Sequence, residues 1–163
     1  TGVQTCALPI SDISVRYQYV DAMALNLVRQ PWEYDVLVME NMFGDILSDL
    51  GAGVVGGMGM APCGEIGLEH GLFQPAHGSA PDIAGSGRAN PTAMLVSASM
   101  MLHWLGQRHA NAHCQLAGER LDAAVTAGYA EGEFLPYEFG GTSGTMEIAN
   151  RLCRPPAING ESG

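Results

Sequence analysis

The sequence contains no lysine, and all seven of its basic residues are arginine. A chain without lysine cannot supply an amine as a general acid, a general base or a Schiff-base nucleophile. The 17 acidic residues bring the formal net charge to −10. Because nucleic-acid binding needs clustered cations, this balance argues against a nucleic-acid partner, while it is compatible with a divalent metal ion.

Long apolar runs are also missing from the 163 residues. No run reaches the roughly 18 residues that a membrane span needs, and no charged start followed by an apolar stretch marks a signal peptide. The four cysteines lie far apart without a CxxC motif, which disfavours a zinc knuckle and a disulfide framework. We therefore expect a reduced, cytoplasmic protein with no membrane partner, built as one domain or as part of a larger protein.

Strands and helices alternate in the predicted order, which indicates an α/β fold. Period-two alternation predicts a strand at 13–17, and an apolar, β-branched run predicts a buried strand at 34–39. Apolar periodicity and end signals predict helices at 21–30, 43–50, 92–105, 112–127 and 145–152. Residues 60–90 are rich in Gly and Pro and are predicted to be irregular, a length that compact domains keep mostly for function.

Asp45 and Asp49 are four residues apart on a predicted helix, so their Cβ atoms lie about 6 Å apart on one face. Carboxylate oxygens are the ligands that Mg²⁺ and Mn²⁺ prefer. The spacing alone is more typical of two solvated carboxylates on an exposed face, and both alternatives stay open at this point.

Residues 51–56 read GAGVVG and match the GxGxxG dinucleotide fingerprint. The fingerprint works only where it follows a strand and opens a helix, so that the helix N-terminus faces the pyrophosphate. Here it follows a predicted helix, so we reject it and expect these glycines to end that helix.

The loop 73–91 is a second ligand candidate, since its glycines and small residues let a ligand approach the backbone closely. Asp82 could accept hydrogen bonds from two neighbouring hydroxyl groups, as acidic residues do on the ribose of NAD. A plain surface loop is the alternative.

Several blocks, in this order, resemble the isocitrate/isopropylmalate dehydrogenase family of NAD(P)-dependent β-decarboxylating enzymes: YVDAMAL (19–25), NMFGDILSD (41–49), HGSAPDIAG (77–85), ANPT (89–92) and GGTSGT (140–145). The resemblance covers residues 14–152 and is greatest to the isopropylmalate dehydrogenases. It implies an α/β fold of isopropylmalate dehydrogenase type, with non-Rossmann dinucleotide binding, that is incomplete in this chain. The expected parts are an unmatched, possibly foreign segment (1–13), part of a smaller dimerising domain (14–55), part of a larger cofactor-binding domain (56–152) and a tail (153–163).

The resemblance also implies the site residues. Asp45 and Asp49 would bind Mg²⁺ or Mn²⁺ in one subunit of a homodimer, and Asp21 of the partner subunit would complete that site. The cofactor would be NAD, because NADP-using relatives place a cation at the position of Asp82. The residues implied to bind it are His77, Gly78, Ser79 and Ala80 along the cofactor, Asp82 at the adenosine ribose and Asn90 near the adenine.

The implied reaction oxidises a 2-hydroxy acid that carries a carboxylate on the neighbouring carbon, passes hydride to NAD and releases CO₂. The family's catalytic lysine and tyrosine, and the arginines that bind the substrate, lie upstream of Tyr19, so we expect this chain alone to be inactive. Gln74 stands where relatives usually carry Glu. Isopropylmalate, isocitrate, homoisocitrate, tartrate and D-malate stay open as substrates, as does a non-catalytic dimerisation or nucleotide-binding module.

Overall fold

A computed structural model describes residues 13–153 of the chain. The chain divides into two compact units, the first ending at Gly51 and the second beginning at Ala52. The segments expected to be foreign and tail-like lie almost wholly outside the described residues. The assignment of the two units to a dimerising and a cofactor-binding domain stays a prediction. None of the described helices combines the length and the apolar character that crossing a membrane requires.

Among the described residues, two α-helices lie wholly or mostly in the first unit, and both were predicted. Helix α2 (Val20–Arg29) carries Asp21 in its first turn and Arg29 in its last turn, where each charge is favourable to the helix dipole. A short 3₁₀ helix, η1 (Pro31–Glu33), follows, with its proline at the first helical position. Helix α3 (Asn41–Val54) runs beyond the predicted 43–50 and includes Gly51 and Gly53. The prediction that these two glycines end the helix is therefore wrong.

The two strands predicted in the first unit are not formed. Residues 13–19 and 34–40 contain no strand, and the side chains of Val36 and Val38 are 80% and 78% exposed. A strand requires a second strand to satisfy its main-chain hydrogen bonds, and the described residues provide none beside either segment. The apolar pattern alone was therefore not enough to predict a strand in either segment.

The second unit begins with a β-hairpin that lies inside the stretch predicted to be irregular. Strand β1 (Pro62–Ile66) pairs antiparallel with β2 (Gly71–Pro75), with Pro62 opposite Pro75. Proline has no N–H to donate, and here it is confined to the open end of the hairpin. The prediction of irregular structure is wrong for the two strands and correct for the connection between them and for the segment after β2, which holds a short 3₁₀ helix, η3 (Pro81–Ile83).

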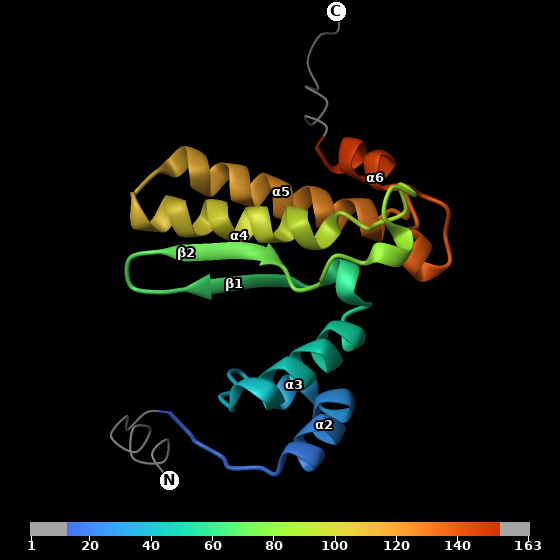
Figure 1. The fold of residues 1–163 in the computed structure, drawn as a ribbon. Coiled ribbons are helices and arrows are strands. Elements are labelled where there is room, and N and C mark those ends of the chain that lie inside the picture. The colour runs from blue at the N-terminus through green and yellow to red at the C-terminus, as the bar shows by residue number, and fades with distance from the viewer. Residues whose placement is uncertain (1–12, 154–163) are drawn as a thin grey trace, which may run out of the picture. The chain divides into compact units, whose positions relative to one another are not determined.

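Helix α4 (Thr92–Arg108) is the centre of the second unit, as its apolar sequence predicted. It lies between the hairpin and helix α5 (Ala112–Ala130), as Figure 1 shows. The hydroxyl of Ser97 donates to the carbonyl oxygen of Gln74 on β2 at 2.7 Å, and that of Ser99 donates to the carbonyl oxygen of Gly118 on α5 at 3.1 Å. Small residues on both sides of α4 therefore allow close packing in three layers.

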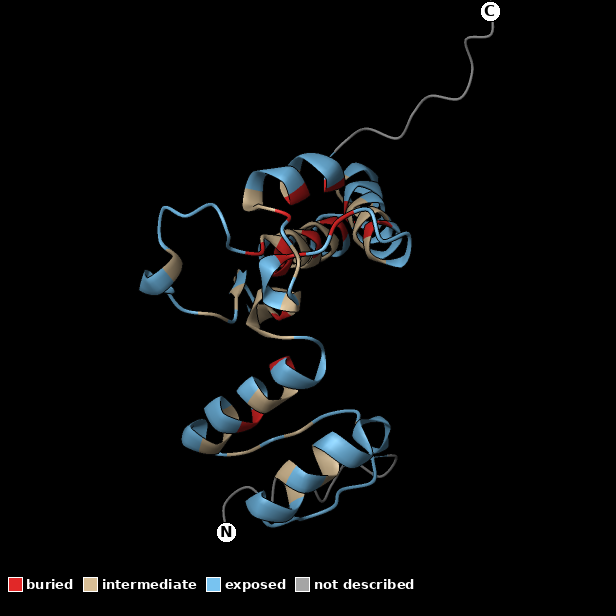
Figure 2. Ribbon diagram, turned by 90° about the vertical axis from the view of Figure 1, so that its right-hand side faces the viewer, coloured by how far each residue is buried: buried red, intermediate tan, exposed pale blue. Residues whose placement is uncertain are grey.

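Helix α6 (Thr145–Leu152) has the bounds that the sequence predicted. Its Ile148 and Leu152 join Phe134 in the core cluster, where buried residues concentrate (Figure 2). The backbone of the turn before α6 requires glycine at two positions. Gly140 has φ of +79°, and a Cβ at Gly141 would overlap the carbonyl oxygen of Leu135.

Candidate functional site

The candidate site is formed on one side by the loop between β2 and α4. Its backbone enters the left-handed region at Ala80 (φ 43°), just before η3, and again at Gly85 and Gly87. Turn hydrogen bonds stabilise the segment between them, including the one from the Ser86 hydroxyl to the carbonyl oxygen of Ile83 at 2.6 Å. The loop therefore has a defined conformation, although most of its residues are exposed.

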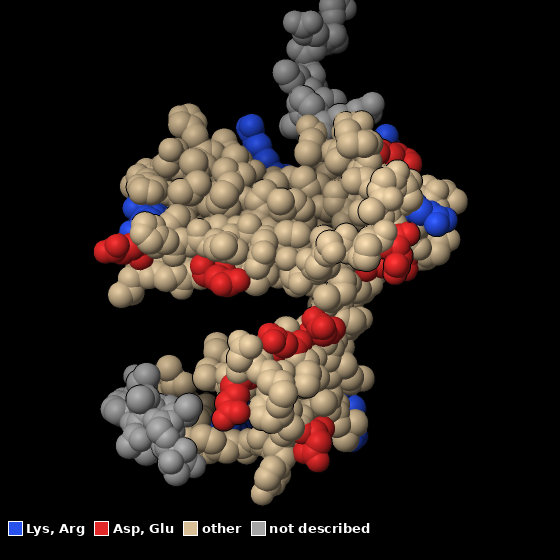
Figure 3. All heavy atoms as spheres, viewed as in Figure 1, with Lys and Arg blue, Asp and Glu red and all other residues tan. Residues whose placement is uncertain are grey.

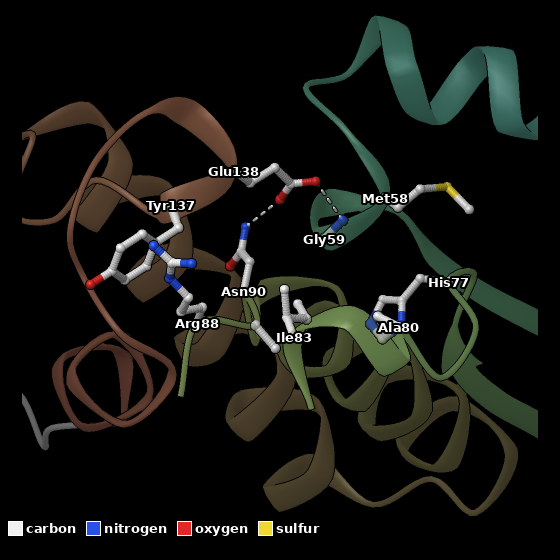
Figure 4. Close-up of a pocket in the computed structure, with 10 residues that line it drawn as sticks. Met58, Gly59, His77, Ala80, Ile83, Arg88, Asn90, Tyr137 and Glu138 are labelled. Atoms are coloured by element: carbon white, nitrogen blue, oxygen red, sulfur yellow. Dashed lines mark hydrogen bonds between the residues drawn. The ribbon is translucent and has the colours of Figure 1, made fainter. Parts of the chain in front are cut away.

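A pocket of about 430 Å³ lies between this loop, the segment after α3 and the 3₁₀ helix η4 (Tyr137–Phe139), all in the second unit. Its volume falls within the range of about 300–1,000 Å³ that is common for small-molecule sites. Figure 4 shows the residues that line it, which come from these three segments. They are Met58, Gly59, His77, Ala80, Ile83, Arg88, Ala89, Asn90, Tyr137 and Glu138.

The polar wall of the pocket is organised by Glu138. One carboxylate oxygen accepts a hydrogen bond from the Gly59 N–H at 3.0 Å, and the other accepts one from the Asn90 side-chain amide at 3.1 Å. A Cβ at Gly59 would overlap this carboxylate, so only glycine leaves room for the contact. The carboxylate thus joins three segments that are far apart in the sequence.

Asn90 is only 8% exposed and its side chain is fully engaged within the protein. Its amide oxygen accepts from the Thr92 N–H at 3.1 Å and from the Thr92 hydroxyl at 2.7 Å, while its NH₂ group donates to Glu138. The Thr92 hydroxyl also lies 2.7 Å from the phenol of Tyr129. Any contact between Asn90 and a ligand in the pocket therefore falls to its main chain.

Arg88 is the one arginine among the residues that line this pocket. Its guanidinium carbon lies 4.5 Å from the centroid of the Tyr137 ring, a cation–π contact that orients the side chain. A guanidinium presents a planar fork of donors that suits phosphate or carboxylate groups. The pocket therefore combines an anion-binding group with the apolar surfaces of Met58, Ala80 and Ile83.

The predicted cofactor residues are distributed around two neighbouring hollows. His77 and Ala80 line the pocket described above and also a second one of about 450 Å³, which Gly78 and Ser79 line together with Thr145 and Met146. Asn90 lines only the first.

Asp82 lies in the first turn of η3, is exposed and lines neither pocket, although the adjacent Ile83 lines both. Gln74 is outside both pockets as well, and its side-chain amide donates to Glu65 across the hairpin at 3.3 Å. The roles assigned to these two residues stay predictions.

The predicted metal ligands are exposed carboxylates of the first unit. Asp45 and Asp49 are one turn apart on α3, where Asp45 accepts a hydrogen bond from the Asn41 amide at 3.4 Å. Asp21 lies on α2 and accepts from the Ala22 N–H at 2.7 Å. Within residues 13–153, no three side chains of the metal-binding types lie close enough to hold one ion. Acidic groups are dispersed over the face shown in Figure 3.

Two oxygen ligands on α3 suit a hard divalent ion, and no third metal-binding side chain lies beside them among the described residues. A ligand from a second subunit therefore stays a prediction.

Sequence reasoning missed Arg88, Tyr137, Glu138 and Gly59 as lining residues. Arg88 directly precedes the ANPT block, so its position beside a matched motif was an available signal. Tyr137 and Glu138 only precede the glycine turn at 140–145, and no local pattern connects them to a loop some 50 residues earlier in the chain. Their contribution follows from the packing of α4 and α5, which the sequence does not specify.

A sequence model of the family described as isocitrate/isopropylmalate dehydrogenase matches residues 3–152. The chain belongs to this family. It is a family of NAD-dependent decarboxylating dehydrogenases, so the resemblance found in the sequence blocks and the α/β fold class are confirmed.

Relatives in the isocitrate/isopropylmalate dehydrogenase family carry names for more than one substrate. The 3-isopropylmalate/3-methylmalate dehydrogenase of Methanocaldococcus jannaschii is 45% identical over 143 residues, which are 88% of this chain and 40% of that protein. The human isocitrate dehydrogenase [NAD] subunit alpha, mitochondrial, is 43% identical over 145 residues, which are 88% of this chain and 37% of that protein.

The crystal structure of isocitrate dehydrogenase from Methylococcus capsulatus superposes with a TM-score of 0.81 at 38% identity, covering 91% of this chain and 42% of that one. The chain therefore spans about two-fifths of the length of the relatives that it matches.

Proposed function

We propose that this chain is the C-terminal part of an NAD-dependent dehydrogenase that oxidises and decarboxylates a 2-hydroxy acid with a carboxylate on the neighbouring carbon. The observation that carries the proposal is the pocket at residues 77–90, where a sequence block that matches the family meets the guanidinium of Arg88. Within this class we favour a substrate of the 3-isopropylmalate type, with isocitrate, homoisocitrate, tartrate and D-malate as alternatives.

NAD fits the chemistry of the residues around the pocket. The adenine and its ribose would rest against Met58, Ala80 and Ile83, and the guanidinium of Arg88 would face the pyrophosphate. Asp82 would accept hydrogen bonds from the two ribose hydroxyls, since its exposed carboxylate has no cationic partner among residues 13–153. His77, Gly78 and Ser79 would follow the remainder of the cofactor, and Asn90 would contact the adenine through its main chain.

The aspartates of α3 fit Mg²⁺ or Mn²⁺ by their donor chemistry. Asp45 and Asp49 would hold the ion in one protomer of a cytoplasmic homodimer, with Asp21 of the partner subunit as the third carboxylate. When bound, the ion would act as a Lewis acid on the substrate oxygens. The two α3 carboxylates would hold the ion in place, while Arg88 and Asp82 would hold the cofactor.

The proton transfers of this reaction are expected to require the family's catalytic lysine, and this chain contains no lysine. We therefore expect the 163-residue chain to bind NAD and to produce no NADH. A nucleotide-binding or dimerisation module without catalysis is the second candidate. Sequencing the source DNA upstream of the Thr1 codon separates the two, because the dehydrogenase requires an open frame that continues into a segment with a lysine and several arginines.

Calorimetric titration of the purified chain with NAD tests the cofactor site. Because hydrogen bonds to a charged group contribute about 1.5–3 kcal/mol each, Asp82→Ala should weaken NAD binding by about tenfold or more. Glu119→Ala is the matched control, since Glu119 is an exposed carboxylate on α5 outside both pockets. No binding of NAD by the unchanged chain, or equal binding by the Asp82 variant, would contradict the proposal.

A further inference from the structure

Within the described chain, the cofactor loop, residues 77–89, is hydrogen-bonded to other elements of the second unit through one residue, in addition to the cation–π contact of Arg88 with Tyr137. Among the hydrogen bonds of the described chain, two connect this loop to another element, and both come from Thr145. Its main-chain N–H donates to the carbonyl oxygen of Gly87 at 2.8 Å, and its hydroxyl donates to that of Ala89. The other hydrogen bonds of the loop are formed within it.

Thr145 is mounted on a rigid element. It is the first residue of α6, whose start is stabilised by the Glu147 carboxylate accepting from the Gly144 N–H at 3.3 Å. Three residues further along, Ile148 is completely buried in the core cluster. The hydroxyl of Thr145 does not cap its own helix but points to the loop. The contact therefore attaches residues 87–89 to a helix that is anchored in the core.

The two carbonyl groups that Thr145 holds flank Arg88. The guanidinium of Arg88 lines the pocket and rests on the ring of Tyr137, as Figure 4 shows. Gly87 has φ of +69° and the segment is exposed, so its own backbone conformation provides little restraint. Holding the backbone on both sides of Arg88 fixes the direction in which this side chain leaves the loop.

We infer that Thr145 is a positioning residue, which latches the cofactor loop to α6 and keeps Arg88 directed into the pocket. This inference rests on the proposed function, in which Arg88 faces the pyrophosphate of NAD. The latch lowers the cost of binding because the loop is ordered before the ligand arrives.

The first test compares Thr145→Val with Thr145→Ser in the full chain. Valine keeps the shape and the main-chain N–H but removes the hydroxyl, whereas serine keeps the hydroxyl. The loss of one hydrogen bond that orders the loop should raise the Kd for NAD by about three- to tenfold in Thr145→Val. Thr145→Ser should bind within about twofold of the unchanged chain. Thr142→Val is the control, since Thr142 is exposed in the same turn and lines neither pocket.

The second test does not depend on NAD. The chain has no lysine, so trypsin cleaves it only after arginine. Release of the latch should accelerate cleavage after Arg88 in Thr145→Val, while cleavage after Arg120 on α5 should be unchanged, as resolved by mass spectrometry.

The outcomes separate the two proposals. If the unchanged chain does not bind NAD, the proposed function is refuted, and faster cleavage after Arg88 in Thr145→Val would still support the latch. If the unchanged chain binds NAD while Thr145→Val binds equally well and is cleaved at the same rate, the latch alone is overturned. A loss of affinity in Thr145→Ser as large as that in Thr145→Val would also overturn it, because the hydroxyl would then not be the group that matters.

Discussion

Replacing Asn90 by aspartate is the most informative perturbation of the pocket wall. In the native chain the Asn90 NH₂ group donates to Glu138, whose carboxylate can only accept. Asn90→Asp keeps the size of the side chain and the acceptor that serves Thr92, but it removes the donor. Two carboxylates then face each other across the 3.1 Å that the hydrogen bond spans in the native chain.

The magnitude follows from this separation. Two unit charges at that distance repel by about 1 kcal/mol in water and about 5 kcal/mol at an effective dielectric constant of about 20. Asn90 is buried and Glu138 is exposed, so the effective value lies between these limits. With the lost hydrogen bond included, we expect Asn90→Asp to lower the free energy of unfolding by about 2–4 kcal/mol at pH 7.

Urea unfolding followed by Trp104 fluorescence, in a Trp32→Phe background, measures this loss in the second unit. The decisive control is the double variant Asn90→Asp with Glu138→Gln, in which the new amide donates to the new carboxylate and its oxygen still accepts from Gly59. The double variant should recover most of the stability. If the two single effects simply add, or if Asn90→Asp costs no more than Asn90→Ala, the account of this wall is wrong.

The same variant has a defined pH dependence. When two carboxyl groups face each other, the folded state retains a proton to a higher pH than the unfolded state does. Stability therefore rises as pH falls wherever the folded state binds more protons. The deficit of Asn90→Asp should shrink between about pH 7 and pH 5, whereas that of Asn90→Ala should stay constant over this range.

Two further predictions concern the support of the site. Ile148→Ala should cost about 2–5 kcal/mol and Ile148→Val about 0.5–1.5 kcal/mol in urea unfolding, because Ile148 is completely buried; equal effects of the two would contradict the assigned core. Gly141→Ala should lower the free energy of unfolding by about 1–3 kcal/mol, measured as a lower thermal unfolding midpoint, because the added methyl group would overlap a backbone carbonyl that is fixed in place. Gly53→Ala, a helical glycine with open space around it, should be neutral or stabilising, and a loss there as large as at Gly141 would contradict the steric reason.

The helices could be predicted from the sequence because their signals are local. Helix α6 begins after a glycine turn and has Ile148 and Leu152 one turn apart, so both its start and its buried face are specified within ten residues. Helix α4 could be predicted because its apolar stretch is long. The end of α3 was missed because Gly51 and Gly53 lower helix propensity by only about 1 kcal/mol each, which the surrounding helix tolerates.

Strands failed for the opposite reason. The run at 34–39 has the composition of a buried strand, yet Val36 and Val38 are exposed. Such a pattern records the environment that a segment requires, and it forms a strand only where a partner supplies the hydrogen bonds. The hairpin β1–β2 was missed because its strands contain Pro62, Gly64, Gly71 and Pro75, which have low strand propensity. Here the tertiary contact with α4 overrides propensity.

The two walls of the pocket also differ in how far the sequence predicts them. The wall formed by residues 77–90 is a contiguous block, and three of its lining residues, His77, Ala80 and Asn90, were candidates from the sequence. The facing wall depends on the Glu138 carboxylate, which must meet the Gly59 N–H and the buried Asn90 amide from two other segments, and this requires that α4 and α5 are packed together. A relative could keep the block at 77–85 unchanged and still lose the pocket through a side chain at Gly59 or the loss of an acceptor at Glu138. Matching the motif therefore predicts where a cofactor would lie, while the organisation of the pocket also depends on Gly59 and Glu138, which lie outside every matched motif.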